Sequence, residues 1–525
     1  MTKKQQANLS TILTAIYRPA PLPEHAGNPL IEALPPFYRV EDIVDAFARI
    51  PHIADEERRL PAPQRMQAVL RLNEYLEVLP SHFDVIEQIG LLVRAGYAYR
   101  NLSDENYPKL LNTFYHESMN GKIQPIGYSS ASTAPSFALF GVSGVGKSSV
   151  VERALSFLPQ ALLHEKYGFV QVVWLKLDCP LDGSLKQLLN SFLAKLDELL
   201  GTSYQKSMGR GKTIDELILS VAKISAMHHL GMLVIDEIQN LLDASGVGQA
   251  KMLNFFVTFA NEVKIPVFTM GTPRALSLLE GTFREARRVG DHGTHIWDAL
   301  PRGKDWSHFL NCLWQYQWTA EKVDMTADIS KFLHDHTQGI HALVVRLFQL
   351  SQLHAIREGS ECITKELISG VAHAKFKLIA PMLKALKNND KKGIEKYEDL
   401  LVKGLVEIKD EVGLQANLSL LKAQAQKKSQ LSAERTRTIS ALIAMGFEQG
   451  RAQEVVTRFF DANPDLTCDR AVRTILESLD SRAGTDNKST RESLKEIVQT
   501  ATASEHSPLE ALDSAGLIAP IAGIK

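Results

Sequence analysis

The eight residues Gly141–Ser148, which read GVSGVGKS, constrain the fold more than any other stretch. They directly follow a short apolar run, SFALF at 136–140, and precede a stretch of helical character that ends before Pro159. Glycines in such a loop let backbone N–H groups approach a bound group closely, because no Cβ atoms intervene. The pattern GxxxxGK[ST] between a strand and a helix is the phosphate-binding P-loop. The chain is therefore expected to hold a nucleoside triphosphate, with ATP and Mg²⁺ as its cofactors.

The loop residues have separate expected tasks. Lys147 would reach the β- and γ-phosphates, and Ser148 would bind Mg²⁺. Backbone N–H groups and the N-terminus of the following helix would surround the phosphates. A chance match in a Gly/Ser-rich turn is the alternative, and the strand–loop–helix context argues against it. The residues of this loop expected to bind nucleotide are Gly141, Ser143, Gly144, Val145, Gly146, Lys147, Ser148 and Ser149.

A second motif, GMLVIDEIQN at 231–240, lies about 90 residues further on. An apolar strand that ends in Asp236 would present this carboxylate to the nucleotide and its Mg²⁺, directly or through water. The adjacent Glu237 suits a general base that activates the attacking water. The alternative is an acidic pair at a helix N-terminus, favoured by the helix dipole. An additional strand between the two motifs, together with the catalytic Glu237, indicates an ASCE-class ATPase rather than a kinase or GTPase.

Four β-rich runs alternate with amphipathic helices, which predicts an α/β fold with a mostly parallel sheet and flanking helices. The runs are 136–140, 169–178, 231–236 and 266–271. A helix is expected after the capping box Thr213–Glu216. The expected organisation is an extended N-terminal arm (1–37), a helical region (38–120), a P-loop ATPase core (121–318), a helical lid (319–378) and a C-terminal helical region with a flexible partner-binding tail (379–525). A Lys-rich linker is expected after residue 375.

Composition narrows the protein class further. The chain has 525 residues with a formal net charge of −1, so nucleic-acid binding would depend on a local basic patch. The four cysteines are far apart and predict neither a zinc site nor a disulfide framework. The first residues lack the apolar core of a signal peptide, and no long apolar run predicts a membrane span. A cytoplasmic bacterial protein is expected.

Further residues are candidates for contacts to the γ-phosphate. Thr272, at the end of the fourth run, is either a sensor of the γ-phosphate or an ordinary strand ending. Arg287 or Arg288 is a candidate arginine finger for the ATP of a neighbouring subunit. These arginines, together with Arg284, equally suit a solvated basic face or phosphate contacts to nucleic acid. Arg346 is either a nucleotide contact from the lid or a surface arginine.

An ATPase core with a helical lid and arginines that act in trans is the AAA+ plan. Within it, the segments NPLIEALPP, GVSGVGKSS, LKLDCPLDGSLKQ, HLGMLVIDEIQNL and MLNFFVTFANEVKIPVFTMGTP resemble TnsC. TnsC proteins are the AAA+ regulators of Tn-seven-type transposons and are related to the TniB proteins. The resemblance covers roughly residues 28–355. It implies that Lys147 and Ser148 bind ATP and magnesium, and that Asp236 and Glu237 form the Walker B pair. The position of Arg346 is not reliably arginine in the family.

The same resemblance implies a function and partners. TnsC-like proteins assemble with ATP into rings or filaments around double-stranded DNA, largely independently of sequence. They link a target-selecting protein of the TnsD or TniQ type to the transposase subunits TnsA and TnsB, and ATP hydrolysis drives disassembly. The alternatives are a helicase-loader-like or clamp-loader-like remodelling ATPase, and a signalling ATPase that does not touch DNA.

Two loops are candidates for the DNA contacts, since a ring around DNA needs basic or hydroxyl side chains that touch phosphates. One carries Lys186, and the other carries Arg210, Lys212 and Thr213. The alternative is solvated loop charge, with Thr213 serving only as a helix cap. The arm motif NPLIEALPP either packs on the core or recruits a partner. The tail around Leu509–Ile518 either docks on the transposase or forms a terminal helix.

Overall fold

The computed structural model describes residues 12–37, 40–98, 100–121, 134–209, 211–244, 246–276, 293–463 and 466–480. The chain consists of two compact units, which are Met1–Leu414 and Gln415–Lys525. No helix among these residues has both the length and the apolar character needed to cross a membrane.

The first unit is built on a five-stranded parallel sheet in the order β5-β6-β7-β2-β8. Its strands β2, β6 and β7 are buried along their whole length, as expected when helices cover both faces of a parallel sheet. The order places β2, which leads into the P-loop, between β7 and β8, and β6 directly beside β7. The strands are β2 (Ser136–Gly141), β5 (Trp174–Asp178), β6 (Met232–Asp236), β7 (Val267–Gly271) and β8 (Thr294–Trp297).

Helices and 3-10 turns connect these strands. The apolar faces of α8 and α9 share one buried cluster with strands β5 and β6, which holds the helices against the sheet. The capping box predicted at the start of α9 is present, with Thr213 and Glu216 bonded reciprocally. The connecting elements are α7 (Lys147–Leu155), α8 (Leu185–Leu200), the π-helical turn η3 (Gln205–Gly209), α9 (Ile214–Met227), η4 (Ile238–Asp243), α10 (Gly246–Asn261) and η5 (Pro273–Ala275).

The run 169–178, predicted as one strand, is two strands. β4 (Phe169–Val172) pairs antiparallel with β3 (Ala161–His164), while β5 pairs with β6 in the main sheet. Strand β1 (Leu13–Thr14) completes the small sheet in the order β1-β3-β4. The chain changes sheets at Val173, whose N–H donates to Gln160 O at 2.9 Å. Residues 169–178 form one unbroken β-rich run in the sequence, so the run alone could not show that its two halves pair with different strands.

The predicted extended arm contains one helical turn, α2 (Pro29–Glu32). Leu30, Ile31 and Leu34 are buried, so the motif NPLIEALPP packs on the core and these side chains are not displayed to a partner. Asn28 Nδ2 donates to Tyr97 O at 2.9 Å, and Gln171 Nε2 donates to Leu30 O at 3.0 Å. Polar contacts from both helix α5 (Pro80–Ala98) and the small sheet thus fix the arm.

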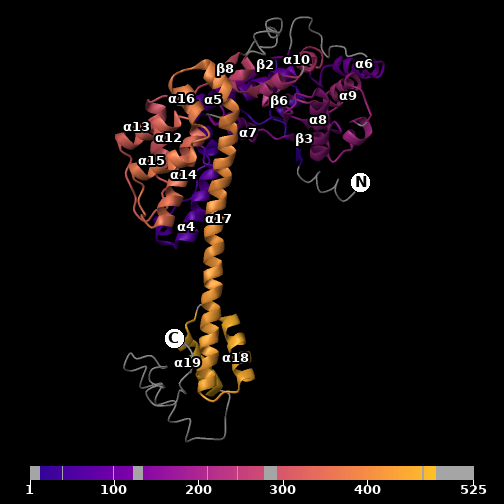
Figure 1. Ribbon diagram of the computed structural model, residues 1–525. Helices are drawn as coiled ribbons and strands as arrows, with labels where there is room; N and C mark the ends of the chain where they lie inside the picture. The colour runs from indigo at the N-terminus through magenta and orange to yellow at the C-terminus, as the bar shows by residue number, and fades with distance from the viewer. Residues whose placement is uncertain are drawn as a thin grey trace. The chain divides into compact units, whose positions relative to one another are not determined.

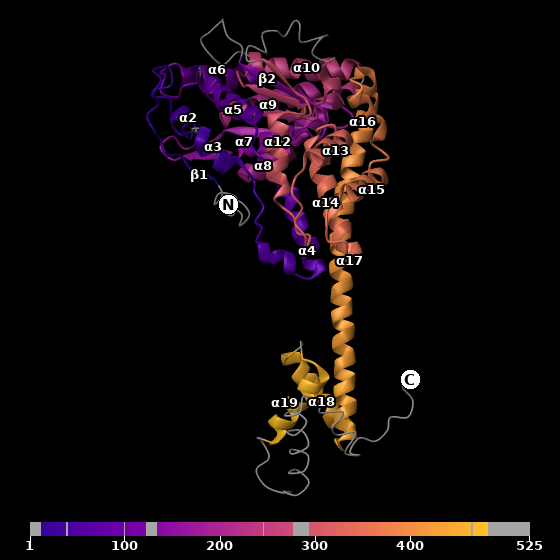
Figure 2. The same cartoon turned by 90° about the vertical axis from the view of Figure 1, so that its left-hand side faces the viewer.

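The remaining helices of the first unit precede and follow the sheet. Helices α13, α14 and α15 lie together in both views (Figures 1 and 2) and pack pairwise, and α12 joins them through the stacked rings of Trp314 and Phe348. The elements before the sheet are α3 (Val40–Phe47), η1 (Asp55–Arg59), α4 (Ala62–Val69), η2 (Leu70–Glu74), α5 (Pro80–Ala98) and α6 (Tyr107–Met119). Those after it are α12 (Lys304–Trp314), α13 (Ala327–Thr337), α14 (His341–Glu358), α15 (Lys365–Lys375) and α16 (Ala380–Lys387).

The region expected to be a Lys-rich linker instead contains helix α17 (Lys391–Ala444), which is 54 residues long. Lysine, glutamate and leucine favour helices, so a charged stretch of this composition is compatible with a continuous helix. In the second unit, α18 (Gln449–Ala462) and α19 (Cys468–Asp480) lie beside the end of α17 in both views (Figures 1 and 2). Leu442, Val456 and Ile475 form the centre of their small core.

Candidate nucleotide-binding site

The P-loop backbone is shaped by two glycines with positive φ. Gly144 has φ 86° and Gly146 has φ 97°, a backbone conformation that residues other than glycine rarely adopt. Gly146 is the N-cap of α7, so the first N–H groups of this helix face the loop without a capping side chain. Unpaired N–H groups at a helix N-terminus, together with the helix dipole, form an anion-binding cradle.

Lys147 is the cation of this cradle. Its side chain is buried, and Nζ donates to the carbonyl oxygens of Gly141 at 2.6 Å and Val142 at 3.2 Å. Desolvation lowers the pKa of Lys147, while the carboxylates of Glu237, Asp236 and Glu398 act in the opposite direction. The amine thus folds back on its own loop with acidic groups around it, and a triphosphate would give it phosphate oxygens as partners.

Asp236 ends β6 and is almost fully buried. Its Oδ1 accepts from the Glu237 N–H at 2.9 Å, and its Oδ2 pairs with Lys176 Nζ at 3.1 Å. Lys176 also bonds Glu152 of α7 at 2.7 Å. Although partial burial opposes it, the hydrogen bond to Glu152 and the charge of Asp236 raise the pKa of Lys176. Each oxygen of Asp236 has one partner and keeps a further lone pair, so the carboxylate could hold a magnesium ion directly or through a water molecule.

Glu237 adopts a left-handed backbone conformation, with φ 56° and ψ 38°, directly after the strand. Partial desolvation and the neighbouring Asp236 charge raise the pKa of Glu237, while Gln239 and Lys147 lower it. Gln239 Nε2 donates to Glu237 Oε2, and Gln239 Oε1 accepts from the Thr272 N–H at 3.1 Å. Gln239 therefore connects the candidate base to the candidate sensor.

Thr272 follows β7 and is 2% exposed. Among the described residues its hydroxyl oxygen has no hydrogen-bond partner. A buried hydroxyl without a partner is costly unless a ligand or water supplies one. Its place beside Gln239 makes a phosphate oxygen or the attacking water a suitable partner.

A pocket lies beside the P-loop. Its walls come from the loop, from residues 72–77 after α4, from Phe309 of α12 and from α14. The aromatic rings of Tyr75 and Phe309 are tilted against each other at 6.1 Å on one wall, as suits a nucleobase. The start of α14 is joined to the loop, because the Ala342 N–H donates to Gly144 O at 2.9 Å.

Arg346 lines this same pocket from α14. Its guanidinium bonds Asn73 Oδ1 and, at 2.7 Å, Gln349 Oε1, and desolvation lowers its pKa. The side chain is thus half-buried and oriented by polar partners beside the P-loop, in contrast to a solvated surface arginine.

Residues 130–279 match the family model described as the AAA domain. The core is an AAA+ domain. This match, the parallel sheet and the P-loop at the end of β2 agree with the predicted fold class. No curated protein matches the sequence at a significant level.

Several solved structures match this chain at low similarity. The Aeropyrum pernix ORC1 protein in complex with DNA is 12% identical with a TM-score of 0.34, over 72% of this chain and 86% of that one. The ORC2 protein of the same organism, in ADPNP–ADP complexes, is 14% identical with a TM-score of 0.32, over 52% and 68%. A Walker-type ATPase of Pyrococcus abyssi is 15% identical with a TM-score of 0.34, over 56% and 79%. Similarity at this level is too low to transfer a function.

The candidate DNA contacts are partly described. Lys186 is exposed in the first turn of α8. Lys212 Nζ donates to Ser220 Oγ of α9 at 3.3 Å, and the Thr213 hydroxyl is engaged in the capping box with Glu216. Arg210 and the candidate fingers Arg287 and Arg288 lie outside the described residues, as does the tail from residue 481.

Helices α8 and α9 run in the same general direction. Asp197, near the end of α8, accepts from the N–H groups of Tyr204 and Gln205, and the Tyr204 hydroxyl bonds His228 at the end of α9. The two C-terminal ends are thus joined while the helices pack along their apolar faces. Lys186 and Lys212, at the two N-terminal ends, therefore lie on the same side of the domain.

Sequence reasoning missed four polar residues of the site: Asn73, Lys176, Gln239 and Glu398. Gln239 could have been predicted from the sequence, because it lies two residues after Glu237 in the second motif. The others come from distant segments, and no local pattern marks them. Glu398 is a buried carboxylate of α17 whose charge acts on Lys147, and Leu405 of the same helix lies against Gly144.

Proposed function

We propose that this chain binds ATP with Mg²⁺, hydrolyses it slowly, and uses the nucleotide to assemble on double-stranded DNA. The main support for this proposal is a group of five residues connected by hydrogen bonds and electrostatic interactions. The group joins the P-loop to the ends of β6 and β7 and consists of Lys147, Asp236, Glu237, Gln239 and Thr272. Four members have the chemistry that phosphoryl transfer to water requires: a cation, a metal-holding carboxylate, a base and a sensor hydroxyl. The fifth, Gln239, is an amide that bonds both Glu237 and the backbone of Thr272.

The residues divide the work among themselves. The P-loop N–H groups and Lys147 bind the phosphates, while Ser148 and Asp236 would hold the magnesium ion. Glu237 accepts a proton from the attacking water, since a carboxylate with a raised pKa is a stronger base than an ordinary one. Gln239 and Thr272 orient that water. Arg346 contacts the nucleotide from α14, so nucleotide binding affects how the lid helices are held.

The DNA-binding part of the proposal rests on Lys186 and Lys212 on one side of the domain, and it includes Arg210 and Thr213, which are close to Lys212 in the sequence. About one or two phosphate contacts per subunit are weak alone and strong when subunits repeat along a duplex. Arg287 or Arg288 is proposed to complete the ATP site of a neighbouring subunit. This would make assembly depend on nucleotide.

We infer the biological role from the resemblance to TnsC over residues 28–355. The protein is a regulator of DNA transposition that links a TnsD- or TniQ-type target selector to the TnsA and TnsB transposase subunits. Hydrolysis at Glu237 then releases the assembly. Finding a gene for an integrase-type transposase beside this one would favour this role over helicase loading.

A gel-shift experiment tests the biochemical core of the proposal. The full chain is mixed with random-sequence duplexes of increasing length and a non-hydrolysable ATP analogue. Binding is expected only with nucleotide, and it should strengthen with duplex length and weaken steeply with salt. Lys147→Ala should abolish the shift, whereas Lys251→Ala, an exposed lysine on α10, should preserve it. A shift that survives in Lys147→Ala contradicts the nucleotide requirement. The absence of any shift for the parent chain favours the signalling ATPase.

A further inference from the structure

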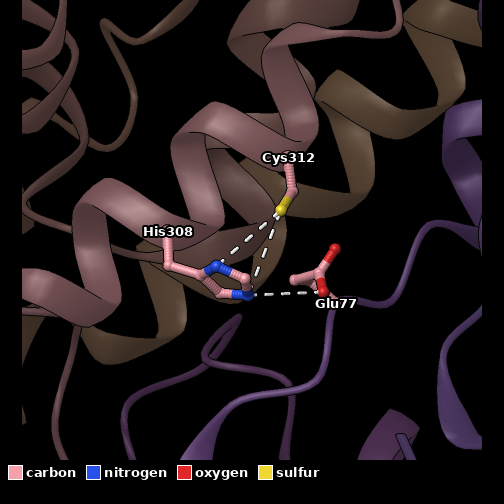
Figure 3. A group of neighbouring side chains, drawn as sticks. All are labelled: Glu77, His308 and Cys312. Carbon is pink, nitrogen blue, oxygen red and sulfur yellow. Dashed lines mark hydrogen bonds and ion pairs between the residues drawn. The ribbon is translucent and has the colours of Figure 1, made fainter. Parts of the chain in front are cut away.

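Glu77, His308 and Cys312 form a cluster of potential metal ligands outside the phosphate-binding loop (Figure 3). One ligand atom from each side chain lies within 4.8 Å of the others. His308 and Cys312 are one helical turn apart on α12, so both point from the same face of the helix. Glu77 comes from the irregular segment after η2 and faces them across the gap. Two separate parts of the chain thus converge on one point.

The distances between these atoms suit a tetrahedral ion. His308 Nε2 lies 3.6 Å from Glu77 Oε1, and Cys312 Sγ lies 4.0 Å from His308 Nε2. In a tetrahedral zinc site with ordinary bond lengths, the N···O edge is about 3.4 Å and the N···S edge about 3.6 Å. These two edges would therefore have to contract by only a few tenths of an ångström to reach coordinating distance, and the third, between Glu77 and Cys312, lies within 4.8 Å.

The surroundings favour binding and leave access to solvent. The Glu77 side chain is 12% exposed and that of His308 is 55% exposed, so an ion can enter on the histidine side and keep a water molecule as fourth ligand. The Tyr75 hydroxyl donates to Glu77 Oε2 at 3.0 Å, which fixes the carboxylate and leaves Oε1 for the metal. Desolvation and Glu77 raise the pKa of the Cys312 thiol. A bound cation would reverse this effect and release the proton.

We propose that Glu77, His308 and Cys312 bind one divalent cation of the zinc class. The donor set of one thiolate, one imidazole nitrogen and one carboxylate oxygen selects a borderline-soft metal over Mg²⁺ or Ca²⁺, which prefer oxygen ligands. On binding, Sγ forms a bond to the metal and its proton passes to water, so no oxidant or reductant takes part.

The location of this site gives it a consequence, which rests on the proposed function. Glu77 lines the pocket beside the P-loop, and so does Phe309, which follows His308 on α12. An ion held by Glu77 and α12 would fasten two walls of that pocket to each other. With the metal bound, these two walls would already be held in place before the nucleotide arrives. Nucleotide binding would then lose less conformational entropy, so the affinity for nucleotide should be higher.

Cobalt spectroscopy tests the site directly. The full chain is stripped with a chelator, dialysed and titrated with Co²⁺. One Co²⁺ per chain is expected, with a near-ultraviolet thiolate-to-cobalt band and the visible bands of tetrahedral cobalt. Added Zn²⁺ should displace it. Since loss of an outer-shell partner alone weakens metal binding about 10- to 100-fold, Cys312→Ser or His308→Ala should weaken it by at least about 100-fold.

Matched controls make the result decisive. Cys362→Ser replaces another half-buried cysteine and His354→Ala another exposed histidine, and both should leave the cobalt bands unchanged. A charge-transfer band that persists in Cys312→Ser, or a folded parent chain that shows no band with excess Co²⁺, overturns the metal site. If the bands appear but Zn²⁺ leaves the affinity for a fluorescent ATP analogue unchanged, the metal site stands and its coupling to nucleotide is refuted.

Discussion

Glu237 has a left-handed backbone conformation that non-glycine residues adopt only at a cost, and such residues concentrate at functional sites. The Glu237 carboxylate accepts a hydrogen bond from Gln239, and Lys147 lies within electrostatic range of it. The identity of Glu237 could be predicted from the local motif. Its backbone conformation and its amide partner could not, because both depend on how η4 packs under β7.

Replacing the candidate base tests its role. Glu237→Gln keeps the size of the side chain and removes its basicity, so ATP should still bind. Phosphate release should fall by about 10²- to 10⁴-fold, the usual contribution of a general base. The measurements are a phosphate-release assay and titration with a fluorescent ATP analogue. Glu165→Gln, in the exposed turn after β3, should change neither, and rapid turnover in Glu237→Gln would remove Glu237 as the base.

The pH dependence tests Gln239 as a positioning residue. Glu237 must be deprotonated to act, so activity should rise with pH through a pKa above its ordinary value of 4.5. Gln239 donates to the charged carboxylate and lowers that pKa. Gln239→Ala should therefore shift the acid limb of the rate profile to higher pH. An acid limb that does not move would show that Gln239 has no influence on the base.

At the scale of elements, the sequence predicted strands β2, β6 and β7 and the helix after the P-loop, since local apolar spacing determines them. It missed β8 at the edge of the main sheet, and it treated β4 and β5 as one run. It could not predict how α4 joins the lid. Arg65 and Glu361 are 296 residues apart in the chain, yet they form two hydrogen bonds of 2.5 and 2.6 Å. Arg65 Nη1 also donates to Trp318 O at 3.1 Å. Such contacts exist only once the tertiary structure has formed.

This ion pair yields a stability prediction. Glu361→Gln leaves the buried Arg65 charge without its carboxylate, which should cost about 3 kcal/mol and lower the midpoint of urea unfolding. The hydrogen bonds from Arg65 lower the pKa of Glu361, so its stabilising contribution is complete above the ordinary carboxyl pKa and is lost as pH falls through the lowered one. The difference between parent and variant should therefore shrink on acidification. The exposed Glu366→Gln is the control, and a constant difference at all pH values would contradict the account.

At the N-terminus of α9, the neighbouring residues Lys212 and Thr213 allow helix capping and DNA contact to be tested separately. Thr213→Ala removes the cap and should destabilise the domain by about 1 kcal/mol, because the capping box is fully formed. Lys212→Ala leaves the cap intact. It should weaken DNA binding and flatten the salt dependence, with Lys186→Ala acting alike and Lys251→Ala acting as control. An unchanged salt slope in both lysine variants would remove these two loop lysines from the DNA interface.

At the scale of the first unit, the site is assembled from segments that are far apart in sequence. Residues near 73, 144, 237, 346 and 398 all contribute, through the pocket wall, the P-loop, β6, α14 and α17. The nucleotide would therefore contact the lid as well as the sheet, so its binding can change how the lid is held. The motifs locate the chemistry along the chain, whereas this coupling between distant segments is visible only in the structure.

Sedimentation velocity of the full chain with duplex DNA and a non-hydrolysable ATP analogue tests the central claim most directly. The account predicts multi-subunit complexes whose mass grows with duplex length, that require nucleotide and that are absent for Lys147→Ala. A chain that binds the analogue yet sediments as a single particle at saturating nucleotide and DNA would contradict it.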